Sequence, residues 1–278
     1  MSTAPRYPSA PSDRFRYGWR YVRVVAPDGS ETFDQVPLTL RDVLFPKTGD
    51  FIVQTDGHDN DVSYLKYVFK ARLAGDKTAA VLSDCRVDWN LPGVEPLGPD
   101  IAVFLGVRRH RDWATFDVAA EGARPALVVE VTSPDTRQND VGDKFAFYLQ
   151  AKVPLYLIAD ASDRGDERDL ELIGYRYTRR GFRPIPPDEN GRIYLKPVNL
   201  YVGVTRDRLA GYARLACYDP ETGEELGDYT AVAKACAAAL RQARTAKRQA
   251  AAKAKALAAA EARIRELEAQ LKNRKKNT

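Results

Sequence analysis

The stretch ALVVEVTSPDTRQNDVGDKFAFYLQAKVPLYLIAD, residues 126–160, has the pattern of a strand, a helix and a second strand. Residues 126–131 are mostly apolar and rich in β-branched side chains, a composition typical of a strand that is buried on both faces. Ser133 and Pro134 interrupt that run, and a second apolar run follows at 154–159. With a helix between them, the two runs predict a βαβ unit.

The helix of this unit is expected to begin at Asn139 or Asp140, because either side chain can cap a helix N-terminus. It should end near residue 151. Asp140, Lys144 and Tyr148 are four residues apart in turn, so they should share one face of the helix.

Two acids stand where packing alone does not explain them. Glu130 interrupts the apolar run 126–131, and a charge in a buried strand is costly unless another group compensates it. Asp100 follows Gly98 and Pro99 and opens the apolar run 101–107, which also reads as a strand. We therefore expect the two carboxylates to serve a site rather than the core.

Asp100, Glu130 and Lys144 could form one such site. Carboxylates at the ends of neighbouring strands can hold Mg²⁺, which prefers oxygen ligands and retains several waters. A bound metal ion lowers the pKa of a water and stabilises charge on a phosphate, and a nearby lysine can orient the water or neutralise charge. The residue types thus favour hydrolysis of a phosphodiester.

Four motifs occur in a fixed order along the chain. They are GPDIAV at 98–103, LVVEVTSP at 127–134, D-x3-K-x3-Y at 140–148 and VPLY, leading to Asp160, at 153–160. In type, order and spacing they resemble the Uma2 family, formerly DUF820, over roughly residues 37–205. That family is placed in the PD-(D/E)XK nuclease superfamily, so the resemblance implies a restriction-endonuclease-like α/β core, a mixed sheet flanked by helices.

The resemblance also implies roles for single residues. Asp100 matches the aspartate of the PD motif, and Glu130 matches the acid of (D/E)XK. Thr132 stands where the superfamily has its strand lysine, whereas Lys144 matches the helix lysine of Uma2-like proteins. Asp100 and Glu130 are therefore the expected ligands of Mg²⁺ or Mn²⁺, with Lys144 as the third catalytic residue and Tyr148 as an accessory one.

A further accessory residue is expected near the start of an upstream helix, where the superfamily often has an acid. His58, Asp59 and Asp61 are the candidates, and the sequence leaves that role open among them. Asp140 is another possible accessory residue. The segment Leu82-Ser83-Asp84 also resembles the family.

The function implied is a metal-dependent endonuclease that hydrolyses DNA. The alternative is an inactive nuclease fold that acts as a DNA-binding or coiled-coil interaction module, and the sequence does not decide whether the protein is an enzyme. Plainer interpretations exist for the site. Glu130 could be held by an ion pair with Lys144 or Arg137, while Asp140 and Lys144 could be a surface pair.

The remaining chain suggests three parts. Residues 1–16 are expected to be disordered, 17–228 to form the core with an N-terminal β-hairpin at 17–36, and 229–278 to form a long helix. Leu257, Ile264 and Leu271 are seven residues apart, which predicts a coiled coil over the last heptads. A homo-oligomer, most simply a dimer, is expected through the core, the coiled coil or both.

Further elements are predicted from local periodicity and turn residues. Helices are expected at 40–45 and 59–74, a loop at 108–124, and strands at 51–55, 79–83, 86–89, 169–177, 182–185 and 200–204.

Composition limits the class of protein. The net charge is +5, and the segment 241–276 contains far more Lys and Arg than Glu, which favours contact with phosphates or acidic surfaces. Three cysteines without a CxxC pair argue against a disulfide scaffold or a cysteine zinc site. No signal peptide and no apolar run of roughly 18 residues is apparent, so a cytoplasmic protein with no membrane contact is expected.

Overall fold

The computed structural model describes residues 13–133, 136–164, 167–206 and 211–227, with six residues between 241 and 249. The chain divides into two units, Met1–Leu226 and Gly227–Thr278. The six described residues between 241 and 249 are helical and exposed. The coiled coil predicted over 257–271 and most of the disordered segment predicted at 1–16 lie outside the described residues.

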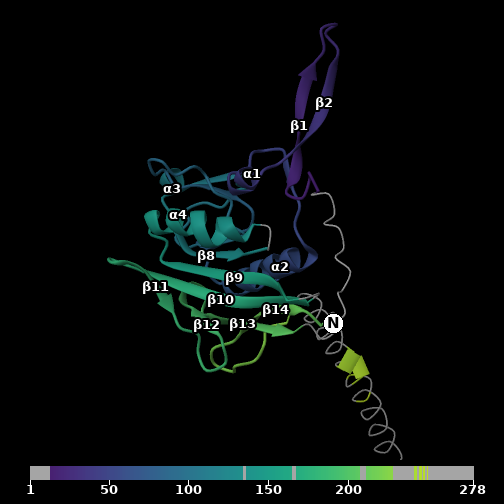
Figure 1. The fold of residues 1–278 in the computed structure, drawn as a ribbon. Helices are drawn as coiled ribbons and strands as arrows, with labels where there is room; N and C mark the ends of the chain where they lie inside the picture. The colour runs from purple at the N-terminus through teal and green to yellow at the C-terminus, as the bar shows by residue number, and fades with distance from the viewer. Residues whose placement is uncertain are drawn as a thin grey trace, which may run out of the picture. The chain divides into compact units, whose positions relative to one another are not determined.

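A six-stranded mixed sheet forms the centre of the first unit, in the order β11-β10-β9-β8-β6-β4 (Figure 1). The strands, in that order, are Gly181–Ile185, Glu167–Thr178, Leu155–Arg164, Pro125–Val131, Ile101–Phe104 and Ala80–Leu82. Only β8 and β9 run parallel, and they are the two strands of the predicted βαβ unit. The other pairs are antiparallel. The predicted mixed α/β sheet is confirmed.

Short helices surround the sheet. They are α1 (Leu40–Leu44), α2 (Asp56–Arg72), α3 (Val118–Glu121), the π-turn η1 (Asn139–Asp143), α4 (Lys144–Gln150) and the 3-10 turn η2 (Lys196–Val198). Thr39 caps α1 in a reciprocal capping box with Asp42. Helix α2 begins three residues before its predicted start because the Thr55 side chain accepts a hydrogen bond from the N–H of His58.

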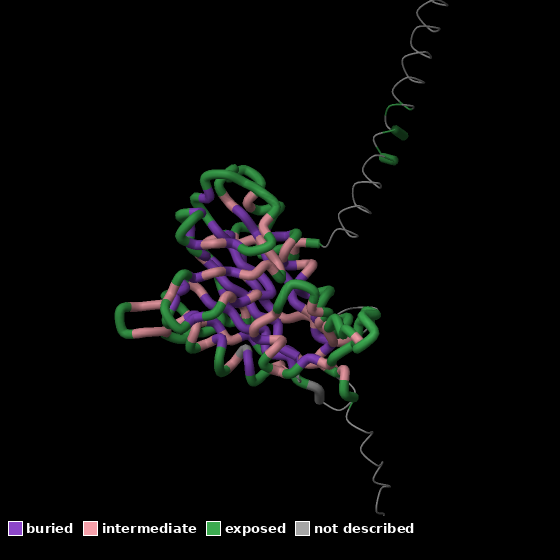
Figure 2. Tube along the Cα trace, turned by 90° about the horizontal axis from the view of Figure 1, so that it is seen from above, coloured by how far each residue is buried: buried purple, intermediate pink, exposed green. Residues whose placement is uncertain are grey.

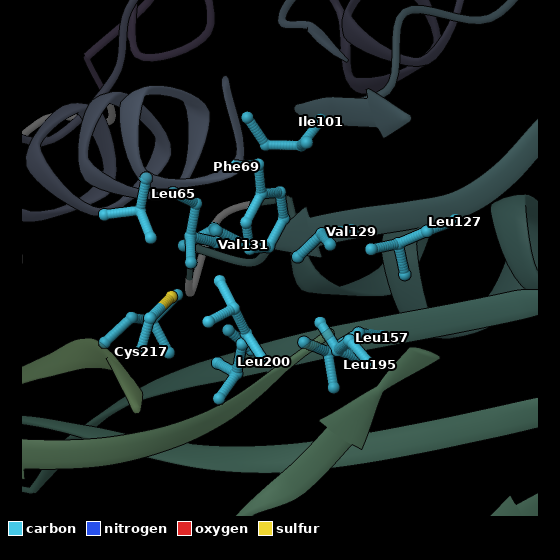
Figure 3. Packing of buried hydrophobic residues seen from close by; sticks show 14 of the residues in the cluster. Leu65, Phe69, Ile101, Leu127, Val129, Val131, Leu157, Leu195, Leu200 and Cys217 are labelled. Carbon is cyan, nitrogen blue, oxygen red and sulfur yellow. The ribbon is translucent and has the colours of Figure 1, made fainter. Parts of the chain in front are cut away.

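One face of the central sheet packs against α2 and a second, three-stranded sheet. The strands of this second sheet are β12 (Ile193–Leu195), β13 (Leu200–Arg206) and β14 (Ala213–Tyr218). Leu65 and Phe69 of α2 lie over Val129 and Val131 of β8 in this core (Figure 3). Along β8, alternate residues belong to this core, as the two-residue period of a strand requires.

The opposite face of the sheet packs against α4, α3 and a two-stranded sheet, β5 (Arg86–Asp88) with β7 (Thr115–Asp117). Val128 belongs to this core, and Glu130, two residues further along β8, lies on the same face of the strand. The buried residues run through the middle of the unit, with exposed residues on its outer loops (Figure 2). The strand that carries Glu130 is therefore covered on both faces.

Four elements were not expected from the sequence. The predicted loop at 108–124 contains β7 and α3, so that prediction was wrong, and β12 and β14 fall where no strand was predicted. Strand β14 and the residues after it are stabilised by a partner distant in the sequence: Tyr64 of α2 donates to the Leu226 carbonyl and accepts from the N–H of Cys217. Local periodicity carries no such information.

The N-terminal hairpin is present as predicted, formed by β1 (Gly18–Val25) and β2 (Glu31–Pro37). It extends away from the central sheet (Figure 1). The predicted strand at 51–55 is the shorter β3 (Asp50–Ile52), which pairs with the base of β1. Gly18 at that base has φ +105°, and a Cβ there would lie 1.8 Å from the Phe51 carbonyl oxygen, so the pairing requires glycine.

None of the described helices is both long and apolar enough to span a membrane. Cys85 and Cys217 are free thiols, and Cys236 lies outside the described residues.

Candidate active site

The two acids singled out in the sequence lie opposite each other on adjacent strands. Ile101 of β6 pairs with Val129 of β8 in antiparallel register, which places Asp100 beside Glu130. The N–H of Asp100 lies 3.4 Å from Oε2 of Glu130. The sheet thus brings together two carboxylates that are 30 residues apart in the chain.

Glu130 is fully buried, and its polar neighbours include Lys144, Tyr148 and the N–H of Asp100. Its Oε2 lies 2.8 Å from Nζ of Lys144, and its Oε1 accepts a 2.5 Å hydrogen bond from the Tyr148 hydroxyl. Lys144 and Tyr148 lie one turn apart on α4, so a single helix face supplies a cation and a hydroxyl to the buried acid.

Asp100 contacts α2, which packs on the other face of the central sheet from α4. Its Oδ2 accepts a 2.7 Å hydrogen bond from the N–H of Val131 and lies 3.2 Å from Nε2 of His58, in the first turn of α2. Burial of Asp100 opposes ionisation, but His58, Lys144 and the Val131 N–H outweigh it and hold the pKa of Asp100 below its usual value. The carboxylate therefore stays ionised in the folded protein.

A π-turn sets the position of Lys144. Asn139–Asp143 forms the π-turn directly before α4, and no side chain caps its start. The prediction that Asn139 caps the helix was wrong, because its side-chain amide donates instead to the Leu40 carbonyl at 2.9 Å. The side chain of Asp140 lies outside the described residues. Irregular turns of this kind are frequent at functional sites.

Asp84 is a residue of this site that the sequence analysis did not assign. Its N–H donates to the Pro99 carbonyl, and its backbone is left-handed, with φ +51°. Although Asp84 is exposed at the rim, the packing around its carboxyl and the charge of Asp100 raise its pKa to about 6. Only the motif Leu82-Ser83-Asp84 pointed to it.

The candidates on α2 have separate environments. Asp61 is buried and binds Arg168 at 2.7 Å and the N–H of Leu215 at 2.8 Å, so its carboxylate fastens α2 to β10 and β14. Asp59 is exposed; its N–H donates to the Thr55 carbonyl, and within the described part of the chain its carboxylate makes no hydrogen bond or ion pair. Of the three candidates, only His58 contacts Asp100.

Thr132, at the position of the superfamily's strand lysine, serves a different cluster. Its hydroxyl donates to Asp160 at 3.0 Å and accepts from the N–H of Ala161 at 2.8 Å. Arg137 also binds Asp160, through Nε at 2.8 Å and Nη2 at 2.7 Å. The ion pair considered between Glu130 and Arg137 is therefore absent, whereas the pair considered with Lys144 is present.

The donor atoms fit a hard divalent cation in kind. Asp100 and Glu130 supply carboxylate oxygens, and Mg²⁺ is commonly held by one or two carboxylates with waters in the remaining positions. Oδ1 of Asp100 has no hydrogen-bond donor among the described residues. Within the same residues, no cluster of three or more His, Cys, Asp or Glu side chains is placed to hold a metal ion. Any metal here would therefore depend on water ligands.

Comparison with known proteins agrees with the motif resemblance. Residues 48–184, roughly half of the chain, match the Uma2 family, described as "Putative restriction endonuclease". No curated protein matches. A solved structure of "a putative nuclease belonging to DUF820" from Anabaena variabilis has 15% identity and a TM-score of 0.38, and the match covers 57% of this chain and 89% of that chain. The assignment to a family therefore rests on the family match and not on this structure. Asp84, Asp100, Glu130 and Lys144 all lie inside the matched residues, and this segment of the chain is a Uma2-family domain.

Proposed function

We propose that this protein is a divalent-metal-dependent phosphodiesterase that cleaves DNA. One observation carries the proposal: two carboxylates face each other on adjacent strands, and a lysine from α4 and a histidine from α2 meet them there. Buried charges concentrated in this way are uncommon in a purely structural core and are typical of catalytic sites.

Asp100 and Glu130 would hold Mg²⁺ or Mn²⁺, which when bound would polarise a phosphate and make a water more acidic. His58, 3.2 Å from Asp100, orients that carboxylate. Lys144, 2.8 Å from Glu130, presents a cation beside that acid and beside the reacting phosphate. Tyr148 fixes the other oxygen of Glu130, so both catalytic carboxylates are held in place before substrate binds.

The accessory role on α2 is best filled by His58. Asp61 is already bound by Arg168 and the backbone of β14, and Asp59 points to solvent. A single exposed acid such as Asp59 therefore provides a matched control for substitutions within the site.

A non-catalytic function is the competing proposal, and one observation favours it. Both oxygens of Glu130 are already engaged, by Lys144 and by Tyr148. Such an arrangement also suits a decayed nuclease core in which the acid and the lysine only neutralise each other. In that case the protein would bind DNA or a partner protein without cleaving anything.

Nicking of supercoiled and single-stranded DNA separates the two functions. We expect cleavage by the unaltered protein with Mg²⁺ or Mn²⁺ and none with EDTA. Asp100→Asn and Glu130→Gln should abolish it, and Lys144→Met should lower it by roughly 100-fold or more. Asp59→Asn should cleave normally. No cleavage by the unaltered protein on any substrate would favour the non-catalytic function, and equal cleavage by all variants would indicate another site.

Metal binding has its own readout in thermal stability. Mg²⁺ at about 100 times its Kd should stabilise the unaltered protein by about 2.7 kcal/mol. The same concentration should stabilise Asp59→Asn equally and Asp100→Asn much less. An equal gain in Asp100→Asn would contradict the proposed ligands.

We also propose that the protein self-associates, most simply as a dimer. The apolar seam of Leu257, Ile264 and Leu271 supports this, because a charged helix with such a stripe normally pairs to bury it.

A further inference from the structure

An open groove of about 730 Å³ lies at the β4 edge of the central sheet. The second half of α2, strand β4 and the segment 110–113 line it. None of the groups proposed to act on the scissile phosphate lines this groove.

The walls of the groove carry positive charge that the protein does not neutralise. Lys66 and Lys70 lie one turn apart on α2, and Lys77 follows in the next loop. No ion pair in the described part of the chain uses any of these three lysines. Burial and the charge of Lys66 lower the pKa of Lys70, as expected for cations placed together without an acid.

The acids that line the groove do little to offset those lysines. The Asp76 carboxylate accepts hydrogen bonds from the N–H and hydroxyl of Thr78, at 2.8 and 2.7 Å, and so is turned into its own loop. The other acid is Asp112, and the arginine next to it in sequence, Arg111, also lines the groove and is paired with Glu121. The lysines therefore dominate the charge available to a ligand.

Two aromatic rings also line the groove, those of His110 and Trp113. The rings of His110 and Trp113 are 5.9 Å apart, and the indole N–H of Trp113 donates to Glu121 at 3.0 Å. That bond and the packing of Trp113 against Phe116 hold the indole in place. A cationic groove with fixed aromatic rings is typical of sites that bind a nucleic-acid strand through phosphates and base faces.

The groove and the candidate active site are joined by a short stretch of backbone. Leu82 and Ser83 line the groove, and Asp84 is the next residue. The N–H of Asp84 donates to the Pro99 carbonyl, and Pro99 directly precedes Asp100. The lining of the groove therefore continues into the backbone that positions Asp100.

We propose that this groove binds the phosphate backbone of a DNA strand next to the scissile phosphate, with Lys66 and Lys70 as the main phosphate contacts. The proposal rests on the proposed function for its substrate class. The size of the groove, about 730 Å³, favours a polymer over a free anion, because one phosphate would occupy only part of it. Backbone contacts of this type give affinity that is independent of sequence and falls with salt.

The test measures binding separately from cleavage. Fluorescence anisotropy with a labelled 20-nucleotide DNA strand in EDTA reports affinity when no metal is present. In the 278-residue chain, Lys66→Gln/Lys70→Gln should weaken binding roughly tenfold near 0.1 M salt and reduce the slope of log K against log salt by about 1.4, or about 0.7 per lysine on a single strand. Unchanged affinity and slope in a folded double variant would overturn the proposal.

The matched control removes the same charge at the far edge of the sheet. Arg176 and Arg183 are exposed and face each other on β10 and β11, at the opposite end of the strand order from β4. Arg176→Gln/Arg183→Gln should bind DNA like the unaltered protein. An equal loss in both double variants would show that net charge, not the groove, determines affinity, and would also overturn the proposal.

Cleavage data then distinguish failure of the groove from failure of the nuclease. Groove-dependent binding without cleavage under any metal would support the groove and refute the catalytic proposal. Cleavage with a KM that Lys66→Gln/Lys70→Gln leaves unchanged would refute the groove and support catalysis. An acidic polypeptide that displaces the DNA strand at equal charge concentration would overturn the assignment of nucleic acid as the ligand.

Discussion

Substitution of Lys144 by methionine tests the energetic role of the buried pair. Glu130 is fully buried and Lys144 is 8% exposed, so Lys144→Met leaves a carboxylate without its cation in the interior. Removing one member of a buried pair typically costs about 3–5 kcal/mol. Tyr148 and the Asp100 N–H still bind Glu130, so we expect a loss near 3 kcal/mol, or a fall in Tm of roughly 10 °C.

Glu130 is the other member of this buried pair. Two close carboxylates suggest that loss of Glu130 would relieve repulsion and raise stability. The structure instead places a cation and a hydroxyl on Glu130, so Glu130→Gln should destabilise, by about 2 kcal/mol, because it leaves the Lys144 cation without its charge partner.

A double-mutant cycle measured by urea denaturation in EDTA checks both values. Glu130→Gln/Lys144→Met removes both charges while keeping an acceptor for Tyr148, so it should be less destabilised than the sum of the single variants by about 2–3 kcal/mol. If the two single changes in unfolding free energy add to within about 0.5 kcal/mol, or if Lys144→Met loses less than about 1 kcal/mol, the ion pair does not stabilise the folded protein as proposed.

Three further outcomes are expected. Asp84→Asn should stabilise the protein above pH 6, because the folded pKa of Asp84, about 6, exceeds the usual 3.8 and the wild type loses stability as pH rises through that interval. The gain, kept to about 1 kcal/mol or less by solvent exposure, should vanish below about pH 4 in thermal melts run in EDTA. A gain independent of pH would refute the charge explanation. Thr132→Lys should lower the free energy of unfolding in urea by about 2–4 kcal/mol, because Thr132 is 1% exposed and its hydroxyl bonds both Asp160 and the Ala161 N–H. For the same reason it should not restore cleavage to Lys144→Ala. Recovered cleavage would show that a lysine at position 132 can reach the site. Deleting residues 229–278 should leave a folded core and lower the mass in light scattering, whereas an unchanged oligomer would place self-association in the core.

The sequence predicted the centre of the fold well because its strands are apolar on both faces. The βαβ unit and the approach of Asp100 to Glu130 follow from short apolar runs that carry one acid each, and the motif order supplied Lys144. The prediction that Lys144 and Tyr148 share one helix face is confirmed, because both residues lie in α4.

The parts that the sequence missed depend on distant contacts. Strand β14 is held by Asp61 and Tyr64, about 150 residues earlier in the chain, and no local pattern encodes such a pairing. The π-turn before α4 depends on a bond from Asn139 to Leu40. Asp84 reaches the site only through its left-handed backbone and its bond to Pro99, which propensities do not anticipate.

The N-terminal hairpin implies a gradient of amide hydrogen exchange along a single pair of strands. At its base, Trp19 stacks on Phe51 and Arg20 bridges Asp42 and Asp50. Beyond this base, β1 and β2 pair only with each other and are exposed. An isolated two-stranded ribbon is marginally stable in water. The outer amides of the hairpin should therefore exchange with solvent through local fraying, whereas the amides of β8 should exchange only through global unfolding.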